Sequence, residues 1–263
     1  MNRAWAVTRK EWAEVFKNRF VIFTVAFMPL LLTAIPLIIL GATGSAEEMT
    51  GLSSADMPPS FAELCDEMSG EECAQYFIIS QFLLLFMLIP LAIPVTIATY
   101  SVVGEKTTRT LEPVLATPIT TGEFLAGKAL AAVLPAIAAT WAAFLVFVAG
   151  CVALGAGPQL LDRLTEPQWL TAIFAVGPLL SLAAANVALM VSSRANDPRV
   201  AEQISMLVIL PLLGLFFAQI AGLAIINLNL ILWMGAAVLA IDAGLIAFAV
   251  QLFQRESILT RWK

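Results

Sequence analysis

The sequence of 263 residues contains no histidine, few charged side chains and three cysteines. The lack of histidine excludes His-ligated zinc, c-type haem attachment and Ser-His-Asp triads, which all need an imidazole. Charged residues make up 13% of the chain and hydrophobic residues 60%, whereas about a quarter of an ordinary soluble domain is charged. The mean hydropathy is +0.90. This composition predicts a membrane protein and excludes most familiar hydrolase chemistry.

Six apolar runs, free of charged residues except for Asp242 in the last, are long enough to cross a membrane as helices. Crossing a hydrocarbon core of about 30 Å takes about 20 helical residues. None of the runs alternates with period two over the length of a strand, and backbone groups in lipid must be paired within the protein. We therefore predict an all-α, polytopic membrane protein with a single transmembrane domain over residues 1–263. The predicted spans are residues 20–41, 76–103, 129–154, 169–192, 203–226 and 230–254.

Basic residues are concentrated in segments on one side of the predicted spans. Because Lys and Arg in short loops are retained on the cytoplasmic side, their distribution predicts the orientation of the chain. All of the 14 basic residues except Arg163 fall in the N-terminal segment, in the loops after the second and fourth spans, or in the C-terminal tail. Both termini are therefore expected in the cytoplasm.

The first loop on the far side, residues 42–75, contains eight acidic residues and no basic one. Its acidic side chains either form a solvated surface or attract cations. Cys65 and Cys73 both lie in this loop, where the compartment is oxidising, so we expect a disulfide rather than free thiols or a metal site. A cleavable signal peptide over residues 1–46 is disfavoured, because the apolar run of about 22 residues exceeds the usual 7–15.

Residues 1–19 are too polar to cross a membrane but have an amphipathic pattern. Trp5, Trp12 and Phe16 fall on one helical face, whereas Lys10 and Glu14 fall on the other. Trp, Lys and Arg are the side chains that anchor helices at headgroup depth. This segment is predicted to be an interfacial helix in contact with membrane lipid. A solvated leader is the alternative.

The predicted cytoplasmic segment after the second span covers residues 104–128. Within it, Gly122 to Lys128 fit the letters of a phosphate-binding loop. The next residue is Ala129 instead of the Ser or Thr that holds magnesium, and no strand precedes the motif. We therefore expect no ATPase site in this chain and no enzyme activity of its own.

The same segment contains a short amphipathic pattern. Leu111, Val114 and Leu115 form an apolar stripe, charged residues surround the stripe, and Pro118 ends it. An amphipathic helix at this place could present one face to a soluble partner. A solvated connecting loop is the alternative that composition alone favours.

The letters of this segment resemble the signature of type-2 ATP-binding-cassette permeases, which reads roughly E-K/R, G-T-L-E, L-L-A-T-P, E and G-K. The six spans with cytoplasmic ends and an interfacial leader are similar to that family as well, so the resemblance covers nearly the whole chain. The matching residues are Glu105, Lys106, Thr110, Leu111, Glu112, Leu115, Ala116, Thr117, Pro118, Ile119, Glu123, Gly127 and Lys128.

The resemblance implies a permease subunit of an ATP-driven exporter in the cytoplasmic (inner) membrane of a prokaryote. It implies a homodimer or pseudo-dimer of six-span subunits, with a second copy of the chain as the expected partner. It also implies a separate cytoplasmic ATPase, which would bind ATP and magnesium while this chain holds no cofactor. Relatives by this motif include sodium-extruding, drug-exporting and lipid-exporting systems. The residues implied to couple to the ATPase are Glu105, Lys106, Thr110, Leu111, Glu112, Leu115, Thr117 and Pro118.

Asp242 is the acidic residue that lies well inside a predicted span. Intramembrane carboxylates are rare and costly, so this one is expected to face a neighbouring helix or a polar path. The first alternative is a hydrogen bond to Asn186 or Gln219, and the second is contact with an ion or substrate. The second would fit an ion-gradient-driven transporter, which is the alternative function.

Two further function classes have little support in the residues. An intramembrane enzyme would need paired intramembrane acids or a G-x-S-x-G motif, and the sequence has neither. No metal site is predicted, since no D-x-D-x-D-G spacing occurs. No nucleic-acid partner is expected.

Overall fold

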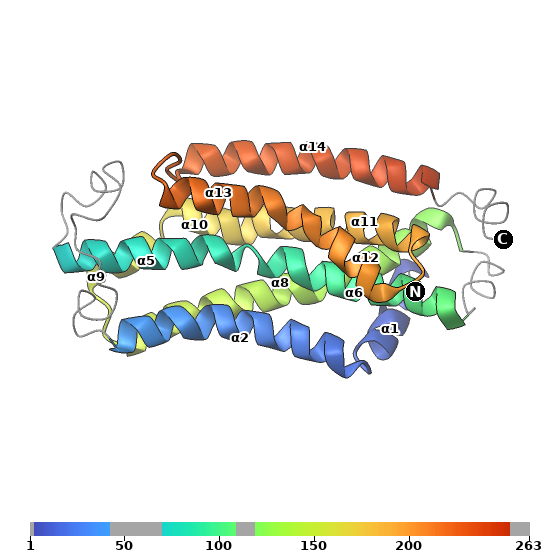
Figure 1. Ribbon diagram of the computed structural model, residues 1–263, viewed down its shortest axis with the longest axis horizontal. Helices are drawn as coiled ribbons and strands as arrows, with labels where there is room; N and C mark the ends of the chain where they lie inside the picture. Colours follow the sequence, from blue (N-terminus) through green and yellow to red (C-terminus); the bar gives the residue numbers. More distant parts are fainter. Residues whose placement is uncertain (1–2, 43–69, 109–118, 253–263) are drawn as a thin grey trace.

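The computed structural model describes residues 3–42, 70–108 and 119–252. Within these ranges the chain is built from helices and contains no strand, which confirms the all-α fold class. The helices run roughly along the long axis of an elongated bundle (Figure 1). The N-terminal helix lies at one end of this bundle. The C-terminal ends of the second and sixth spans lie at the same end.

In the described residues, six helical stretches are long and apolar enough to cross a membrane: Arg19–Gly41, Gln75–Glu105, Thr121–Ala153, Pro158–Arg194, Pro198–Ile220 and Leu228–Ala249. They confirm the number and order of the predicted spans. The first two spans agree with the prediction within a few residues, because their ends coincide with charged or small polar residues that also end the apolar runs.

Each span is made of one or more helical elements. The N-terminal helix is α1 (Arg3–Val15), and the first two spans are α2 (Arg19–Ala42) and the pair α5 (Gly70–Phe86) and α6 (Ile89–Thr108). The third span is α8 (Thr121–Ala153). The fourth contains α9 (Pro158–Leu164), α10 (Pro167–Thr171), the π-helical turn η3 (Ala172–Val176) and α11 (Gly177–Arg194). The last two are α12 (Pro198–Ser205), the 3₁₀ turn η4 (Met206–Ile209) and α13 (Leu210–Ile220), followed by α14 (Leu228–Leu252).

The third span begins at Thr121, eight residues before the predicted start at Ala129. Thr120 and Glu123 form a capping box, in which each side chain accepts a hydrogen bond from the other residue's backbone N–H. This cap starts the helix ahead of the apolar run and therefore places Lys128 inside α8. The stretch from Gly122 to Lys128 is helical, which agrees with rejecting it as a phosphate-binding loop.

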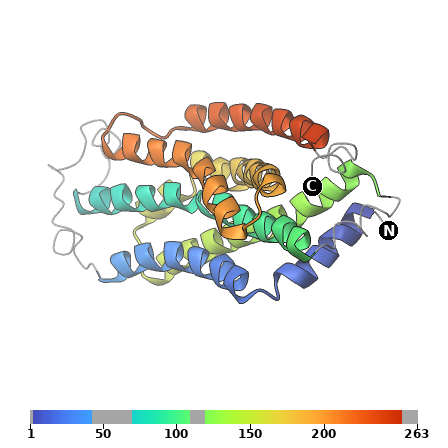
Figure 2. The same ribbon diagram turned by 45° about the vertical axis from the view of Figure 1, so that its right-hand side comes forward.

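The second span forms the centre of the bundle. Most of it is buried, whereas the first, fifth and sixth spans leave broad apolar faces exposed. The central helix α6 packs against α8 and α11, and α14 packs against α11 on the outside of the bundle. Figure 2 shows the same arrangement after rotation, with α14 along one edge and α2 along the opposite edge. The peripheral spans thus have apolar surface available for lipid or for another membrane subunit.

The N-terminal helix α1 forms as predicted, and it also packs against the bundle. Its buried residues are Thr8, Glu11 and Val15, while Trp5 remains 41% exposed. A partly polar face therefore packs against α8 and α6. The predicted apolar face with its tryptophans points away from that contact in part, so α1 is a packed element of the fold as well as an amphipathic helix.

The predicted Cys65–Cys73 disulfide stays a prediction, because Cys65 lies outside the described residues. Among the residues that the structure does describe, the free thiol belongs to Cys151, which is buried in α8. Most of the acidic loop 42–75 also lies outside the described residues. Beyond it, Arg163 in α9 forms an ion pair of 2.8 Å with Glu166.

The contact between α1 and α8 depends on Gly127. A Cβ atom added there would lie 2.6 Å from Cβ of Val7 and 2.7 Å from the backbone oxygen of Ala4. We predict that Gly127→Ala lowers the free energy of unfolding by about 1–3 kcal/mol, the usual cost of overpacking. Thermal unfolding of the purified chain in detergent measures the change.

Gly122 offers a matched control on the same helix, because a Cβ atom there would meet nothing within 4 Å. Gly122→Ala should leave stability unchanged or raise it slightly, since alanine favours helix. Equal stability of the two variants would show that α1 does not pack closely over Gly127.

Candidate functional site

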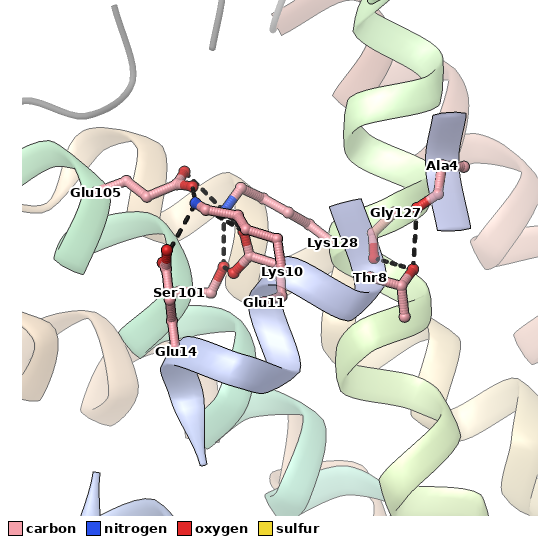
Figure 3. A network of polar contacts seen from close by, with 9 residues as sticks. All are labelled: Ala4, Thr8, Lys10, Glu11, Glu14, Ser101, Glu105, Gly127 and Lys128. Carbon is pink, nitrogen blue, oxygen red and sulfur yellow. Dashed lines mark hydrogen bonds and ion pairs between the residues drawn. The ribbon is translucent and has the colours of Figure 1, made fainter. Parts of the chain in front are cut away.

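A cluster of buried charges joins three helices at the end of the bundle where α1 lies (Figure 3). We call it the α1–α6–α8 cluster, and its members are Lys10 and Glu11 of α1, Ser101 and Glu105 of α6, and Lys128 of α8. The side chains of Glu11, Glu105 and Lys128 are between 1% and 3% exposed. Charged residues are almost never buried to this extent unless they are paired.

Lys128 lies at the centre of the cluster. Its ammonium group is 2.8 Å from Oε1 of Glu11, 2.7 Å from Oε2 of Glu105 and 2.7 Å from Oγ of Ser101. The contacts with Glu11 and Ser101 are hydrogen bonds, and the contact with Glu105 is an ion pair. Ser101 also donates a hydrogen bond to Oε2 of Glu11, so each carboxylate has more than one partner. The Lys128 ammonium also lies 5.1 Å from the ring centre of Phe124.

Lys10 balances the negative charge of the Glu105 carboxylate. It donates a hydrogen bond to Oε1 of Glu105 and forms an ion pair of 3.2 Å with Glu14. Burial disfavours the Lys10 ammonium, but the hydrogen bond and charge of Glu105, with the nearby Glu11 and Glu14, raise the pKa of Lys10. The group therefore stays charged in the neutral pH range. Two ammonium groups then face the two buried carboxylates, and the buried charge is balanced.

Two neutral contacts fix α1 against α8 beside the cluster. The Thr8 hydroxyl donates to the backbone oxygen of Gly127 at 3.0 Å, and the Trp12 indole donates to the backbone oxygen of Ala131 at 2.9 Å. Carbonyl groups that already accept within a helix have a second lone pair for such bonds. Helix α1 thus has specific hydrogen-bond partners along more than one turn of α8.

The structure places one of the predicted coupling residues in this cluster. Glu105 is buried and paired within the chain, so its described partners belong to the subunit itself. The side chain of Lys106 lies outside the described residues. So does the remainder of the set, namely Thr110, Leu111, Glu112, Leu115, Thr117 and Pro118, whose coupling role stays a prediction.

Other residues of the signature also have roles inside the chain. Glu123 caps α8, Gly127 allows the close approach of α1, and Lys128 pairs with Glu11 and Glu105. Sequence reasoning assigned no pairing role to Glu11, Ser101 or Lys128. Glu11 and Lys128 are 117 residues apart, so no local spacing could indicate their contact. Glu11 does share a helical face with Thr8 and Val15, and this spacing was the feature of the sequence that could have indicated its burial.

A further polar contact joins α6 to the start of the fifth span. The Thr96 hydroxyl donates to Oε1 of Glu202 in α12 at 2.7 Å. Asp197 caps α12 by accepting from the backbone N–H groups of Arg199 and Val200. The central helix α6 therefore has polar links to α1, α8 and α12 toward the same end of the bundle.

The three predicted intramembrane polar residues do not bond to one another in the structure. Asp242 of α14 is buried, and neither carboxylate oxygen has a hydrogen-bond partner among the described residues. Gln219 donates to Ser80 at 3.4 Å instead. The predicted hydrogen bond from Asp242 to Asn186 or Gln219 is therefore not formed. In the described ranges, no group of three or more His, Cys, Asp or Glu side chains could hold a metal ion.

Comparison with known proteins identifies the family. The family model described as ABC-2 family transporter protein matches residues 5–254. The chain belongs to the ABC-2 transporter family. The match includes α1, all six spans and the segment that follows α6, so the ABC-2 membrane domain accounts for the fold just described. No curated protein matches the chain. As an ABC-2 chain, it is a multi-pass permease subunit of an ABC transporter.

Removal of Lys128 would leave two buried carboxylates with too few partners. We predict that Lys128→Met lowers the free energy of unfolding by about 3–5 kcal/mol, as expected when one member of a buried ion pair is lost. Lys17→Met is the matched control, because Lys17 is exposed, and it should change stability by less than about 0.5 kcal/mol. Unfolding of the purified ABC-2 chain in detergent measures both.

The double variant Glu11→Gln/Lys128→Met tests the pairing itself. Its cost should be smaller than the sum of the two single costs by about 0.5–3 kcal/mol, because the partners act on each other. Strictly additive costs would contradict the cluster.

Proposed function

We propose that this permease subunit is part of an ATP-driven exporter in the cytoplasmic (inner) membrane of a prokaryote, with both termini in the cytoplasm. It works with a second copy of itself and with a separate cytoplasmic ATPase, which binds ATP and magnesium. The observation that carries this proposal is the α1–α6–α8 cluster. Two of its members, Glu105 and Lys128, flank the segment that would contact the ATPase. Family membership supports the ATPase as partner.

The cluster offers a physical route for coupling. Residues 109–118 lie between Glu105, near the end of α6, and Lys128, in the early part of α8. The ion pair of 2.7 Å between Glu105 and Lys128 links these two helices, and Glu11 links both to α1. A displacement of the connecting segment would therefore move α1, α6 and α8 together. Such movement of packed helices as a unit is one of the ways in which proteins switch between two states.

The substrate pathway would lie between the two membrane subunits. The first, fifth and sixth spans have the least buried surface, so they offer apolar faces to a second copy or to lipid. Closure of the ATPases on ATP would then rock one permease subunit against the other. The energy would come from the different affinity of ATP for the two states of the ATPase.

An ion-gradient-driven transporter that uses Asp242 is the second candidate function. The observation in its favour is that Asp242 is buried in α14 without a hydrogen-bond partner among the described residues. The two candidates differ in their partner, because the ATP-driven exporter requires a separately encoded ATPase. Family membership favours the ATP-driven function.

A substitution in the connecting segment tests the proposal. Leu111→Asp places a charge in the predicted apolar stripe, where truncation or charging of an anchor costs more than about 1 kcal/mol if it is a hot spot. We expect the wild-type chain, purified from its native membrane, to carry an ABC ATPase. Leu111→Asp should insert normally but lose most of this ATPase and of the ATP-dependent transport, as quantified by mass analysis and an ATP hydrolysis assay.

Leu154→Asp is the matched control for this experiment. Leu154 is 49% exposed and lies at the opposite end of α8, so the same chemical change there should leave the ATPase bound. Two results would contradict the proposal. One is a wild-type chain that purifies without any ATPase, and the other is a Leu111→Asp chain that keeps the ATPase and transports normally.

A further inference from the structure

Asp242 lies in the middle of the buried stripe of α14. Ile231, Gly235, Asp242 and Ala249 are buried along this helix, at spacings that put them on one face. Asp242 is 2% exposed. This stripe is the face that packs against α11, η3 and α10. The carboxyl group is therefore turned into the bundle, away from the lipid-facing residues Trp233 and Leu239.

The described residues around α14 provide no charge to pair with Asp242. The elements packed against α14 are α8, α10, α11 and η3. The charged groups on these elements are Glu123 and Lys128 of α8 and Arg194 of α11. Glu123 caps α8, Lys128 is held by Glu11 and Glu105, and Arg194 is exposed at the end of α11. The other titratable side chain on them, Cys151, is at the opposite end of α8 from Lys128.

Asn186 is a second polar residue with an unused group on the neighbouring helix. It is 5% exposed, and its Nδ2 atom has no hydrogen-bond partner among the described residues. Figures 1 and 2 show α11 and α14 side by side, and both helices run toward the same end of the bundle. A Cβ atom on Gly235 would lie 3.2 Å from Val176, which fixes the register between the helices.

This register brings Asn186 and Asp242 to similar depth. Asp242 follows Gly235 by seven residues and Asn186 follows Val176 by ten. With a rise of about 1.5 Å per residue, their levels differ by about 4.5 Å, which is less than one helical turn. Two buried polar side chains with unused hydrogen-bonding atoms thus lie at a similar depth on the neighbouring helices α11 and α14.

The other half of this seam contains a small cavity. An apolar cavity lies there between α5, η3, α11, α13 and α14, and its lining includes Met87, Val176, Leu180, Ile231 and Met234. Part of the lining comes from the π-helical turn η3, and Met87 lies in the break between α5 and α6. Such π-helical turns often mark functional positions. With a volume of about 30 Å³, the cavity leaves room for about one water molecule beside α14.

We propose that Asp242, with Asn186 at a similar depth on the neighbouring helix, is a proton-binding site inside the membrane, and that the proton is exchanged when water enters the seam between α11 and α14. The carboxyl group holds the proton while the seam is closed, because no cation is present there among the described residues. When the seam opens to water, the proton leaves to a water molecule, and the Nδ2–H of Asn186 stabilises the remaining carboxylate. A metal ion fits less well, since no cluster of ligands is found in the described residues. This inference rests on the second candidate function, which it deepens by naming a proton as the ion at Asp242, and it needs no ATPase.

Labelling with dicyclohexylcarbodiimide tests the site in the full-length chain, purified and placed in lipid nanodiscs. This apolar reagent adds to a protonated carboxyl group, and the adduct on the Asp242 peptide is quantified by mass spectrometry. We expect labelling of Asp242 at pH 5 that falls at least tenfold by pH 9. Sodium chloride should not protect Asp242 at constant pH and ionic strength, with choline chloride as the comparison.

Two substitutions resolve the role of Asn186. Asn186→Leu removes the donor that stabilises the carboxylate, so labelling of Asp242 should persist to higher pH. Gln219→Leu is the matched control, because Gln219 is another buried amide and its described partner is Ser80. It should leave the pH dependence unchanged. If both variants behave like the wild type, the assignment of Asn186 to the site is wrong.

Infrared spectroscopy gives an independent reading that does not depend on access of the reagent. The difference between the wild type and Asp242→Asn should contain the C=O band of a protonated carboxylic acid at low pH, and the band should disappear as the pH rises. Labelling and a band that are both absent throughout pH 5–9, or that both persist unchanged across it, overturn the proposal. Protection by sodium would overturn it in favour of a metal-cation site.

Discussion

The arrangement of α1, α6 and α8 depends on the burial of Lys128 between two carboxylates. Glu11 comes from α1 and Glu105 from α6, so this ammonium group has partners on both helices that pack around the start of α8. A buried charge without partners is strongly destabilising, and this makes the geometry of the three helices interdependent. The cap at Thr120 and the close approach at Gly127 then set where α8 begins and how near α1 lies.

The cluster also explains why the connecting segment and the N-terminal helix belong to one unit. In an ABC-2 permease subunit, any soluble partner must act on the membrane spans through segments outside the membrane. Here the helices on both sides of residues 109–118 share an ion pair, and α1 is joined to both. The sixth span lies outside this unit and packs mainly on α11. The molecule thus combines a group of helices around α6 that is linked by buried ion pairs with a peripheral helix α14 that packs mainly on α11.

Much of the fold could be predicted from the sequence, because long apolar runs have few stable conformations in lipid. The six spans and the intramembrane position of Asp242 were predicted on this basis. The start of α8 was not, since the capping box lies before the apolar run. The burial of Glu11 in α1 was not predicted, because it depends on Lys128, 117 residues away. The signature residues Glu105, Gly127 and Lys128 were found by resemblance, but their contacts within the chain required the structure.

Hydrogen–deuterium exchange of α1 tests the central claim most directly. If Lys128 holds α1 against α6 and α8, the backbone amides of Arg3–Val15 should exchange slowly in the wild-type chain in lipid nanodiscs. They should exchange much faster in Lys128→Met, because local opening no longer has to break the buried ion pairs. Exchange in α14 should be the same in both chains. Fast exchange of α1 in the wild type, or equally slow exchange in both chains, would contradict the account.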